Sequence, residues 1–386
     1  MINITERSAC CGCTACANIC PHGAITLQQD AMGFTYPVVN PKVCTNCGLC
    51  DKVCAFHPQY DITENLPSPI PYGARHKNLA EIETSRSGAV FVALADWMLS
   101  QGGVIYGAGY KGHFQVAHKR ATTRDEYFEF KGSKYVQSDM EGIFRNVRED
   151  LQCGKKVLFT GTPCQTAGLR SYIGKKLRNN LYLTDIICHG VPGPNIWRDY
   201  IAFLEKRKGS PIVEVNFRDK SRLGWQSHQE SFKFKDDTYT YTYTYTFYKH
   251  IMFRPSCGNC PYCNTTRPSD ITLADFWGWE KTDKKFNVDD KGCSLVLCNT
   301  EKGVTLFESV MPNLNTIAPR LDDCLQTHLK KPSVLHPLSN QFESDYIKYG
   351  IEYVIKKYCK ETLSERIRKR AGRLKRKILR KIQTIL

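Results

Sequence analysis

The sequence contains no apolar run long enough to cross a membrane, because no window approaches 18 apolar residues. The first 20 residues also lack the apolar segment of a secretory signal peptide, so we expect a cytoplasmic protein. No G-x-G-x-x-G motif occurs, which leaves a nicotinamide site of the Rossmann type without support. In a reducing compartment the 19 cysteines would bind metal as thiolates rather than form disulfides.

The net positive charge is small in most of the chain and concentrated at its end. The formal net charge is +16, and residues 356–386 carry 13 Lys or Arg against Glu361 and Glu365, which is +11. The other 355 residues therefore carry only about +5, which argues against nucleic-acid binding by the body of the protein. A chain of 386 residues is long enough for two or three domains.

Cysteine, in contrast, is abundant in two runs within the first 54 residues. Each run follows C-x2-C-x2-C-x3-C, the spacing that holds two 4Fe–4S clusters in bacterial ferredoxins. Three cysteines of a run wrap one cluster, and the fourth lies too far along the chain and reaches the other. A disulfide framework belongs to short secreted chains, and zinc sites rarely use such triple runs. The predicted ligands are Cys10, Cys13, Cys16 and Cys54 for the first cluster, and Cys44, Cys47, Cys50 and Cys20 for the second.

The chain is predicted to contain two domains, a linker and a tail. Residues 1–57 should form an α+β, ferredoxin-like domain, and the proline-rich stretch 58–79 suits a linker. Helical and strand patterns alternate over 80–345, as in an α/β domain. Residues 346–386 are predicted to be a basic, amphipathic helical tail.

Local patterns place individual elements within these domains. Ser138–Glu141 resembles a capping box that opens a helix to Leu151. Alternating Thr and Tyr over 238–247 predict a strand that pairs with 231–235, with a row of sugar-stacking tyrosines as the alternative. Further helices are predicted over 88–101 and 195–207 and after residue 165, and strands over 24–28, 34–39, 103–110, 115–119, 156–160 and 181–187.

A further group of cysteines lies in the α/β region. Cys164 and Cys188 each follow an expected buried strand, and strand ends are where open α/β sheets place their sites. Ordinary buried cysteines would give the same pattern. The run Cys257-Gly-Asn-Cys260-Pro-Tyr-Cys263 lies shortly before the segment 269–278.

Several motifs, in order over roughly residues 1–345, resemble the family formed by the beta subunits of coenzyme F-420 hydrogenases and dehydrogenases, which also includes 7-hydroxymethyl chlorophyll a reductase. The resemblance implies an FAD-binding α/β body with its own 4Fe–4S cluster, fed here by the fused ferredoxin domain. It implies Cys164, Cys188, Cys257 and Cys260 as the ligands of this third cluster, with Cys263 a spare or alternative ligand. The motifs are Ser87-Gly88, Gly132–Ser138, Gly161–Gln165, Cys188–Pro192, Arg254–Cys257 and Ser269–Gly278.

The sequence identifies the flavin contacts less clearly than the cluster ligands. Ser87-Gly88 opens an apolar helix, so its backbone N–H groups could meet a phosphate, or the pair could simply start the helix. This chain has Ala89 where the family usually has a second glycine, which weakens the phosphate interpretation. The loop 133–135 could contact flavin or substrate, and 275 and 277 could line the pocket or end a buried strand. The candidates are Ser87, Gly88, Ser133, Lys134, Tyr135, Asp275 and Trp277.

His189 is the candidate proton donor because it adjoins a predicted cluster cysteine, although a lone histidine is more often structural. The predicted function is an iron–sulfur flavoprotein oxidoreductase, in which electrons pass singly through the clusters and FAD converts them to a two-electron or hydride step. The acceptor or donor would be a small molecule, with a redox partner protein or a reduced carrier on the other side. The resemblance also implies a link to exopolysaccharide synthesis. The alternative is a non-catalytic electron-transfer module that serves a partner enzyme.

The basic tail carries one apolar stripe at helical spacing, with ten Lys or Arg between its members. Each basic residue near an anionic lipid surface contributes roughly 1 kcal/mol, so residues 363–386 are predicted to bind the inner face of the cell membrane. A helix docked on a partner or a solvated basic end are the alternatives. The stripe is Leu363, Ile367, Ala371, Leu374, Ile378, Ile382 and Ile385.

Overall fold

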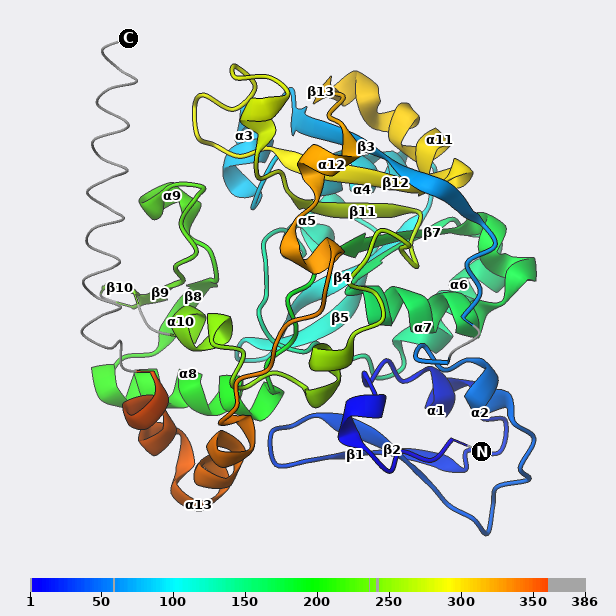
Figure 1. Cartoon of the computed structure of the whole chain (residues 1–386), viewed down its shortest axis with the longest axis vertical. Helices are drawn as coiled ribbons and strands as arrows, with labels where there is room; N and C mark the ends of the chain where they lie inside the picture. Colours follow the sequence, from blue (N-terminus) through cyan, green and yellow to red (C-terminus); the bar gives the residue numbers. More distant parts are fainter. Residues whose placement is uncertain (1, 58–59, 236, 241–242, 360–386) are drawn as a thin grey trace.

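The computed structural model describes residues 2–57, 60–235, 237–240 and 243–359 (Figure 1). Its centre is an eight-stranded mixed sheet in the order β13-β3-β12-β11-β7-β6-β4-β5, so the expected α/β class is confirmed. The strands are β1 Ile25–Gln29, β2 Thr35–Val39, β3 Asn65–His76, β4 Val104–Lys111, β5 Gln115–Ala121, β6 Val157–Gly161, β7 Leu181–Ile186, β8 Ile212–Asn216, β9 Ser231–Phe234, β10 Thr238–Thr240, β11 Ile271–Asp275, β12 Ser294–Thr300 and β13 Leu314–Ile317.

Helices surround this sheet and link its strands. Those predicted over 88–101, after 165 and over 195–207 correspond to α4, α7 and α8. The helices are α1 Ala15–Ile19, α2 Leu49–Lys52, α3 Leu79–Thr84, α4 Val90–Ser100, α5 Arg124–Phe128, α6 Ile143–Gln152, α7 Pro163–Ile173, α8 Pro194–Lys208, α9 Lys220–Leu223, α10 Tyr243–Tyr248, α11 Glu301–Val310, α12 Leu321–Cys324 and α13 Ser339–Tyr358.

The middle of the sheet is parallel. Strands β4, β6, β7 and β11 run in the same direction, whereas β5, β12 and β3 pair antiparallel with their neighbours. Such strands are buried on both faces, and along β6 Leu158 packs with α4 and α11 while Phe159 packs with α6 and α7. The carboxyl ends of β6, β7 and β11 therefore meet at one edge, where α/β sheets carry their sites.

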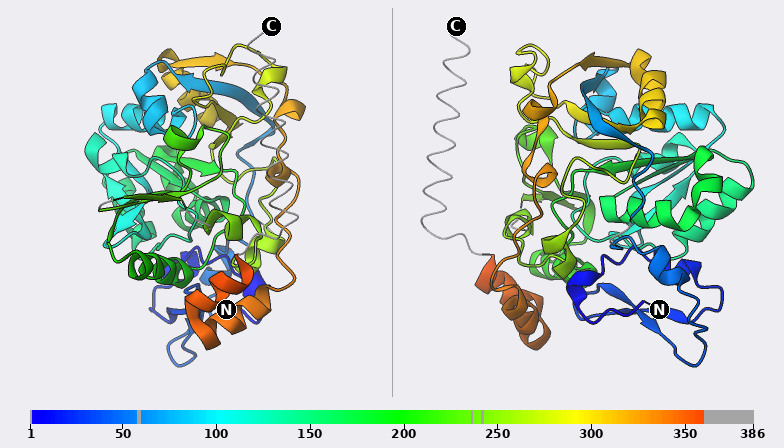
Figure 2. Two further views of the ribbon diagram at one scale, coloured as in Figure 1. Left: turned by 90° about the vertical axis from the view of Figure 1, so that its left-hand side faces the viewer. Right: turned by 45° about the vertical axis from the view of Figure 1, so that its right-hand side comes forward.

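The N-terminal segment folds as predicted and packs against the α/β body. The expected hairpin is present as β1 and β2, which pair antiparallel with Ile25 opposite Val39. Helices α1 and α2 contact each other, and α1 also contacts α7 of the body. Arg7 donates two hydrogen bonds of 2.7 Å to the Glu343 carboxylate on α13, which ties the segment to the C-terminal part of the described chain (Figure 2).

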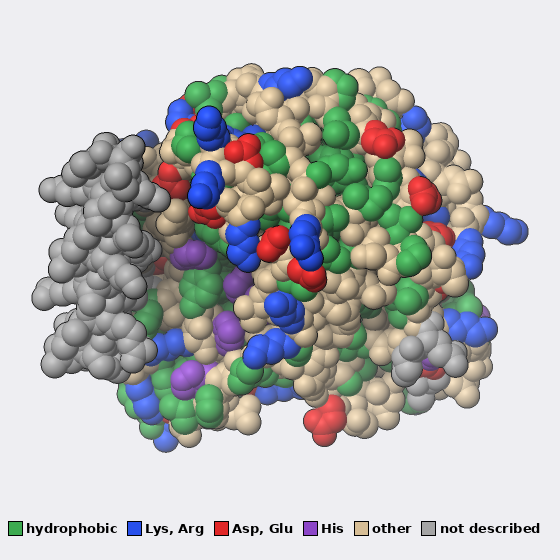
Figure 3. All heavy atoms as spheres, turned by 45° about the horizontal axis from the view of Figure 1, so that its top comes forward, with side chains coloured by type: hydrophobic (Ala, Val, Ile, Leu, Met, Phe, Trp, Pro, Cys, Tyr) green, Lys and Arg blue, Asp and Glu red, His purple; other side chains and the backbone are tan. Residues whose placement is uncertain are grey.

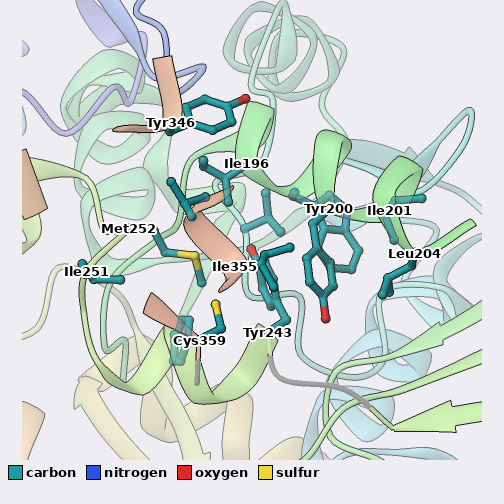
Figure 4. Packing of buried hydrophobic residues seen from close by; sticks show 14 of the residues in the cluster. Ile196, Tyr200, Ile201, Leu204, Tyr243, Ile251, Met252, Tyr346, Ile355 and Cys359 are labelled. Carbon is teal, nitrogen blue, oxygen red and sulfur yellow. The ribbon is translucent and has the colours of Figure 1, made fainter. Parts of the chain in front are cut away.

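A second apolar cluster lies beside the β4–β5 edge of the large sheet. Strands β8, β9 and β10 form a small antiparallel sheet, and α8, α10 and α13 pack beside it. Figure 4 shows Tyr200 and Leu204 of α8, Tyr243 of α10 and Ile355 of α13 in this cluster. Gly350 breaks the helical backbone of α13 with a φ of 77°, a value that favours glycine.

The linker prediction for 58–79 is wrong over most of its length. Residues 65–76 form β3, which lies between β13 and β12 in the large sheet. Strand β13 pairs only with residues 73–76 of β3. The prolines of β3 lie before residue 73, where β3 pairs with β12 on one side and, among the described residues, has no strand on the other. Every second N–H of a strand points the same way, so Pro67, Pro69 and Pro71 can all face the unpaired side.

The capping box predicted at Ser138–Glu141 is also wrong. Helix α6 begins at Ile143 after Gly142, whose φ is 74°. The Ser138 hydroxyl is buried and accepts a hydrogen bond of 2.8 Å from the Gln165 amide, so it caps nothing.

The strand predicted over 238–247 ends early. Thr238 to Thr240 pair with β9 as expected, but α10 begins at Tyr243. The buried Glu230 carboxyl group, whose pKa burial raises to about 7, accepts the N–H groups of Tyr243 and Thr244 at 2.8 and 3.1 Å. These bonds satisfy two backbone donors that a helix N-terminus leaves without a partner.

The predicted tail boundary at residue 346 falls inside α13, which begins at Ser339 and packs against α8. The rest of the predicted tail helix, residues 360–386, lies outside the described residues. Within the described ranges, no helix combines the length and the apolar character that crossing a membrane requires.

Candidate iron–sulfur and redox site

Two cavities in the N-terminal segment are each lined by four of the predicted cluster cysteines. The first is lined by Cys10, Cys13, Cys16 and Cys54 together with apolar side chains that include Ile2, Leu27 and Phe56. The second is lined by Cys20, Cys44, Cys47 and Cys50, with His22 and Ile25 among its other neighbours. In both cavities the fourth cysteine comes from the other run of the sequence, as the ferredoxin spacing predicts.

The donor set of these cavities fits a 4Fe–4S cluster. The four predicted thiols line each space, Cys11 is a fifth cysteine in the lining of the first, and the remaining lining is mostly apolar. No group of three or more His, Cys, Asp or Glu side chains within the described ranges could hold a single metal ion. The two cavities differ in exposure, since Cys13 and Cys16 are buried whereas Cys47 is exposed. Burial raises the pKa of the Cys54 thiol to about 11, so ligation there requires iron to displace the proton.

The first cavity lies against helix α7 of the body. A Cβ atom on Gly168 would come within 2.7 Å of the Cys13 sulfur, so only glycine permits this approach. Cys11 is buried and lines this cavity, and its thiol lies near those of Cys13 and Cys164, which raise its pKa. The first cavity and the start of α7 are therefore joined through Cys11.

Arg254 makes a second connection between the N-terminal segment and the body. Its side chain is buried and donates from Nε to the Cys10 backbone oxygen at 2.7 Å and from one terminal nitrogen to the Thr35 oxygen at 2.8 Å. The same nitrogen lies 3.7 Å from the Cys10 sulfur. The guanidinium charge also favours the thiolate forms of Cys164 and Cys257.

The third group of cysteines gathers at the carboxyl ends of the parallel strands. Cys164 begins α7 just after β6, and Cys188 follows β7. The chain around Cys257 pairs back onto the segment after Cys188, because Arg254 donates its N–H to Val191 at 2.9 Å. Burial raises the pKa of the Cys188 thiol well above its usual value, and the nearby thiols of Cys257, Cys164 and Cys263 raise it further.

A buried ion pair fixes the loop that carries Cys260 and Cys263. Arg267 and Asp185 are almost completely buried and lie 3.0 Å apart, and Arg267 also donates to the Ile186 oxygen at 2.9 Å. The thiols of Cys260 and Cys263 lie close together, and the interaction with Cys260, followed by that with His328, lowers the pKa of Cys263 to about 5. The predicted ligand Cys260 and the spare Cys263 thus lie in the same group.

Histidine side chains gather beside this third group. The His189 and His328 ring centroids lie 4.1 Å apart, and Figure 3 shows imidazoles collected in a hollow of one face. Burial, followed by the charges of His328, His250 and His228, lowers the pKa of His189 to about 3. His189 is therefore neutral near pH 7, where it can hold or donate an N–H proton but is not an imidazolium acid.

Asp275 and Trp277 lie at the same edge of the sheet as the third cysteine group. Asp275 ends β11 and accepts a hydrogen bond of 2.6 Å from Arg218. Burial alone would raise the pKa of Asp275, but the guanidinium groups of Arg218 and Arg86 lower it below the usual value. The Trp277 ring stacks on the buried Trp225 ring at 4.5 Å.

Two further candidates lie beside Asp275 and its arginines. The Ser87 hydroxyl donates to the Cys293 oxygen at 2.6 Å and also contacts the Asp275 carboxylate. Tyr135 stacks on Phe247 at 4.3 Å, and its hydroxyl approaches Arg218. The structure thus brings together the predicted residues Ser87, Tyr135, His189, Asp275 and Trp277.

The remaining candidates have other contacts. The Gly88 N–H donates to the Ser294 hydroxyl at 2.9 Å, and a Cβ there would lie 2.1 Å from the Ala74 oxygen. Its N–H is already engaged, which favours the helix-start interpretation over a phosphate contact. Lys134 donates to the Glu129 oxygen at 2.6 Å within its own loop, and burial lowers its pKa to about 8. Ser133 is half-buried in the same loop.

Two family models match this chain in comparison with known proteins. The C-terminal part of the beta subunit of coenzyme F420 hydrogenase/dehydrogenase matches residues 154–320, and a 4Fe-4S dicluster domain matches residues 9–57. These matches support the family of coenzyme F-420 hydrogenase/dehydrogenase beta subunits. This confirms the resemblance, and with it an iron–sulfur, 4Fe–4S-binding N-terminal region in an electron-transfer oxidoreductase family.

One relative in this family is a subunit of the F(420)H(2) dehydrogenase of Methanosarcina mazei. It is 21% identical over 335 residues, which cover 83% of this chain and 90% of the relative. A chain of the xenon-derivatised F420-reducing NiFe hydrogenase complex from Methanosarcina barkeri aligns with a TM-score of 0.46 and 15% identity, covering 75% of this chain and 91% of that chain.

The sequence did not indicate several residues that shape the site. Arg254 was part of a family motif but carried no predicted role, and its contact with Cys10 joins residues 244 positions apart. Arg86 directly precedes the Ser87-Gly88 motif but had no predicted role, and Arg218 lies in a segment with no metal or catalytic pattern. Trp225 and His228 are isolated in the sequence, and their places in the pocket follow only from the fold.

Proposed function

We propose that the chain is an iron–sulfur flavoprotein oxidoreductase that carries two clusters in its N-terminal segment and a third cluster beside bound FAD. The observation that carries this proposal is the succession of three cysteine groups. The second cavity opens at the exposed Cys47, the first lies against the body, and Cys11 connects the first to Cys164. Electrons would enter at the second cavity and leave at the pocket of the body, or travel in reverse.

The third cluster would be held by Cys164, Cys188, Cys257 and Cys260. Three of these residues follow or pair with the ends of parallel strands, which supports a rigid ligand set. Clusters supply one-electron transfer, and FAD supplies the exchange between one-electron and two-electron chemistry. The protein itself provides burial, hydrogen bonds to sulfur and the Arg254 charge.

The flavin and its reaction partner would occupy the pocket that contains Tyr135, His189, Asp275 and Trp277. His189 would hold an N–H proton next to the third cluster, and His228 hydrogen-bonds to Tyr248 at 2.5 Å farther out. The Methanosarcina mazei relative is named for a reduced deazaflavin coenzyme, so a compound of that type is one candidate substrate. A sugar-linked acceptor in exopolysaccharide synthesis is another.

Protein partners are part of the proposal because the Methanosarcina mazei relative is named as one subunit of a dehydrogenase. Residues 363–386 remain a predicted contact with an anionic membrane surface on the cytoplasmic side. Co-sedimentation with anionic and neutral vesicles tests this contact, because deletion of 363–386 should abolish a preference for anionic vesicles.

The test of the central proposal compares Cys188→Ser with Cys153→Ser, which changes an exposed cysteine outside every group. Both proteins are purified anaerobically, loaded with flavin and mixed with a one-electron reductant. Cys188→Ser should keep the N-terminal clusters and the flavin, yet pass electrons to the flavin much more slowly than Cys153→Ser. Equal rates in the two variants would contradict the route, and a protein that binds no flavin would be an electron carrier instead.

A further inference from the structure

Three cations surround a single buried carboxylate at the end of β11. Arg218 lies 2.6 Å and Arg86 lies 3.6 Å from one oxygen of Asp275, and the exposed fractions of the three side chains are 7%, 11% and 8%. Lys220 lies close enough to Arg86 and Asp275 for their charges to act on it. Burial, followed by the Arg86 charge, lowers the pKa of Lys220 to about 7. The cluster therefore holds one positive charge in excess when Lys220 is neutral and two when it is protonated.

Several N–H groups of these arginines have no acceptor. Nε and one terminal nitrogen of Arg86, and Nε and one terminal nitrogen of Arg218, are buried without a hydrogen-bond partner among the described residues. The buried Arg267 differs, because its nitrogens bond to Asp185, Ile186, Tyr262 and Thr272. Buried donors and charges without partners are costly, so natural sites usually supply an acceptor.

We propose that Arg86 and Arg218 form an oxyanion site that takes a phosphate group of a bound ligand. A phosphate offers several oxygens to two guanidinium forks and carries the charge that would balance the excess at this cluster. One source is the pyrophosphate of FAD, which rests on the proposed function. The other is a phosphate on the substrate, which does not require flavin.

The position of the cluster suits a ligand of the redox pocket. Asp275 ends a parallel strand, and ligands of open α/β sheets bind outside such carboxyl ends. The Arg218 guanidinium lies 5.8 Å from the Trp277 ring centroid, and the Tyr135 hydroxyl is close to it. A phosphate held here would thus anchor a ligand whose remainder extends along the aromatic pocket.

The experiment measures binding of inorganic pyrophosphate to the full chain by calorimetry, with and without bound FAD. Arg86→Gln and Arg218→Gln each remove one guanidinium group, whereas Arg218→Lys keeps the positive charge at position 218. Arg75→Gln is the matched control, because Arg75 is also largely buried but bonds to Asp289 and to the Phe286 oxygen. Iron content and circular dichroism establish that each variant is folded.

The wild-type chain and Arg75→Gln should bind pyrophosphate, and each Gln variant should bind it roughly ten- to a hundredfold more weakly, as expected for loss of a charge-assisted hydrogen bond. Arg218→Lys should fall between. If bound FAD prevents pyrophosphate binding, the phosphate that occupies the site belongs to FAD. If bound FAD does not prevent it, the phosphate belongs to the substrate. Undetectable binding to the wild-type chain, or binding as tight in both Gln variants as in the wild-type chain, would overturn the site. A chain that takes up no flavin but binds pyrophosphate through these arginines would reject the proposed function and keep the site.

Discussion

Arg254 donates a hydrogen bond of 2.7 Å from Nε to the backbone oxygen of Cys10, and a terminal nitrogen lies 3.7 Å from the Cys10 sulfur. This arginine comes three residues before Cys257, so one buried cation lies between the predicted first and third clusters. Its other terminal nitrogen donates to Gln137 at 3.0 Å, and its guanidinium lies 4.2 Å from the Tyr36 ring centroid, which together fix its position.

Arg254→Gln should lower the reduction potential of the first cluster. A buried positive charge and an N–H donor near sulfur stabilise the reduced, more negative cluster, and the substitution removes the charge. We expect a shift of about 60 mV or more, which is about tenfold in a one-electron equilibrium. Redox titration followed by electron paramagnetic resonance measures it. Arg254→Lys should shift less, and an unchanged potential in Arg254→Gln would contradict the role of this charge.

The fourth ligands of the N-terminal clusters should be exchanged between the two cysteine runs. Cys20→Ala should damage the second cluster and leave the first intact, because Cys20 lines the second cavity. Cys54→Ala should do the reverse, because Cys54 lines the first. Iron analysis combined with resonance spectra distinguishes the two clusters. Loss of the first cluster in Cys20→Ala would show that the assignment is inverted.

Gly168→Val should weaken the first cluster and the contact between the N-terminal segment and α7. Even a single Cβ at this position would lie 2.7 Å from the Cys13 sulfur, so either α7 or the cluster loop has to move. Ser171→Val lies on the same helix at a half-buried position and controls for the lower helix propensity of valine. Iron content and protease sensitivity are the measurements. Equal iron retention in both variants would argue against the close packing.

Acidification should destabilise the fold through His118. Its Nε2–H donates to the Thr160 oxygen at 2.9 Å, while Nδ1 accepts from the Ser138 hydroxyl at 2.8 Å, so the buried ring is neutral. Burial lowers its pKa from 6.5 to about 4. The neutral form is favoured in the fold, so this contribution is fully present above pH 6.5 and is lost as the pH falls to about 4.

The loss should amount to about 3 kcal/mol, since one pKa unit corresponds to about 1.4 kcal/mol. Urea unfolding at several pH values measures it. His118→Gln should be less stable at neutral pH but should lose less stability between pH 6.5 and 4. A parallel decline in both proteins would mean that His118 does not control this range.

Regular local patterns were sufficient for much of the fold. The cysteine spacing predicted which cysteines line each N-terminal cavity, and the strands before Cys164 and Cys188 followed from short apolar runs. The strand over residues 65–76 was not predicted because proline normally interrupts a strand. Proline is tolerated in β3 because, within the described chain, part of β3 has no neighbouring strand on one side.

Long-range contacts explain most of the other differences. Residues 243–248 alternate like a strand, but the buried Glu230 carboxylate binds the N–H groups that begin a helix there. The pocket residues Ser87, Asp275 and Trp277 were identified by resemblance to the family. Arg86 and Arg218 meet Asp275 from distant parts of the chain, and no local pattern marks them.

The most direct test of the account is the cofactor content of the anaerobically purified full chain. Iron, acid-labile sulfide and extracted flavin are measured on the same sample, with zinc as a check. Three four-iron clusters and one flavin predict about 12 iron, about 12 sulfide and about one FAD per chain. Zinc in place of iron and sulfide would contradict the clusters, and about eight iron without flavin, even after titration with FAD, would contradict the proposed catalytic body.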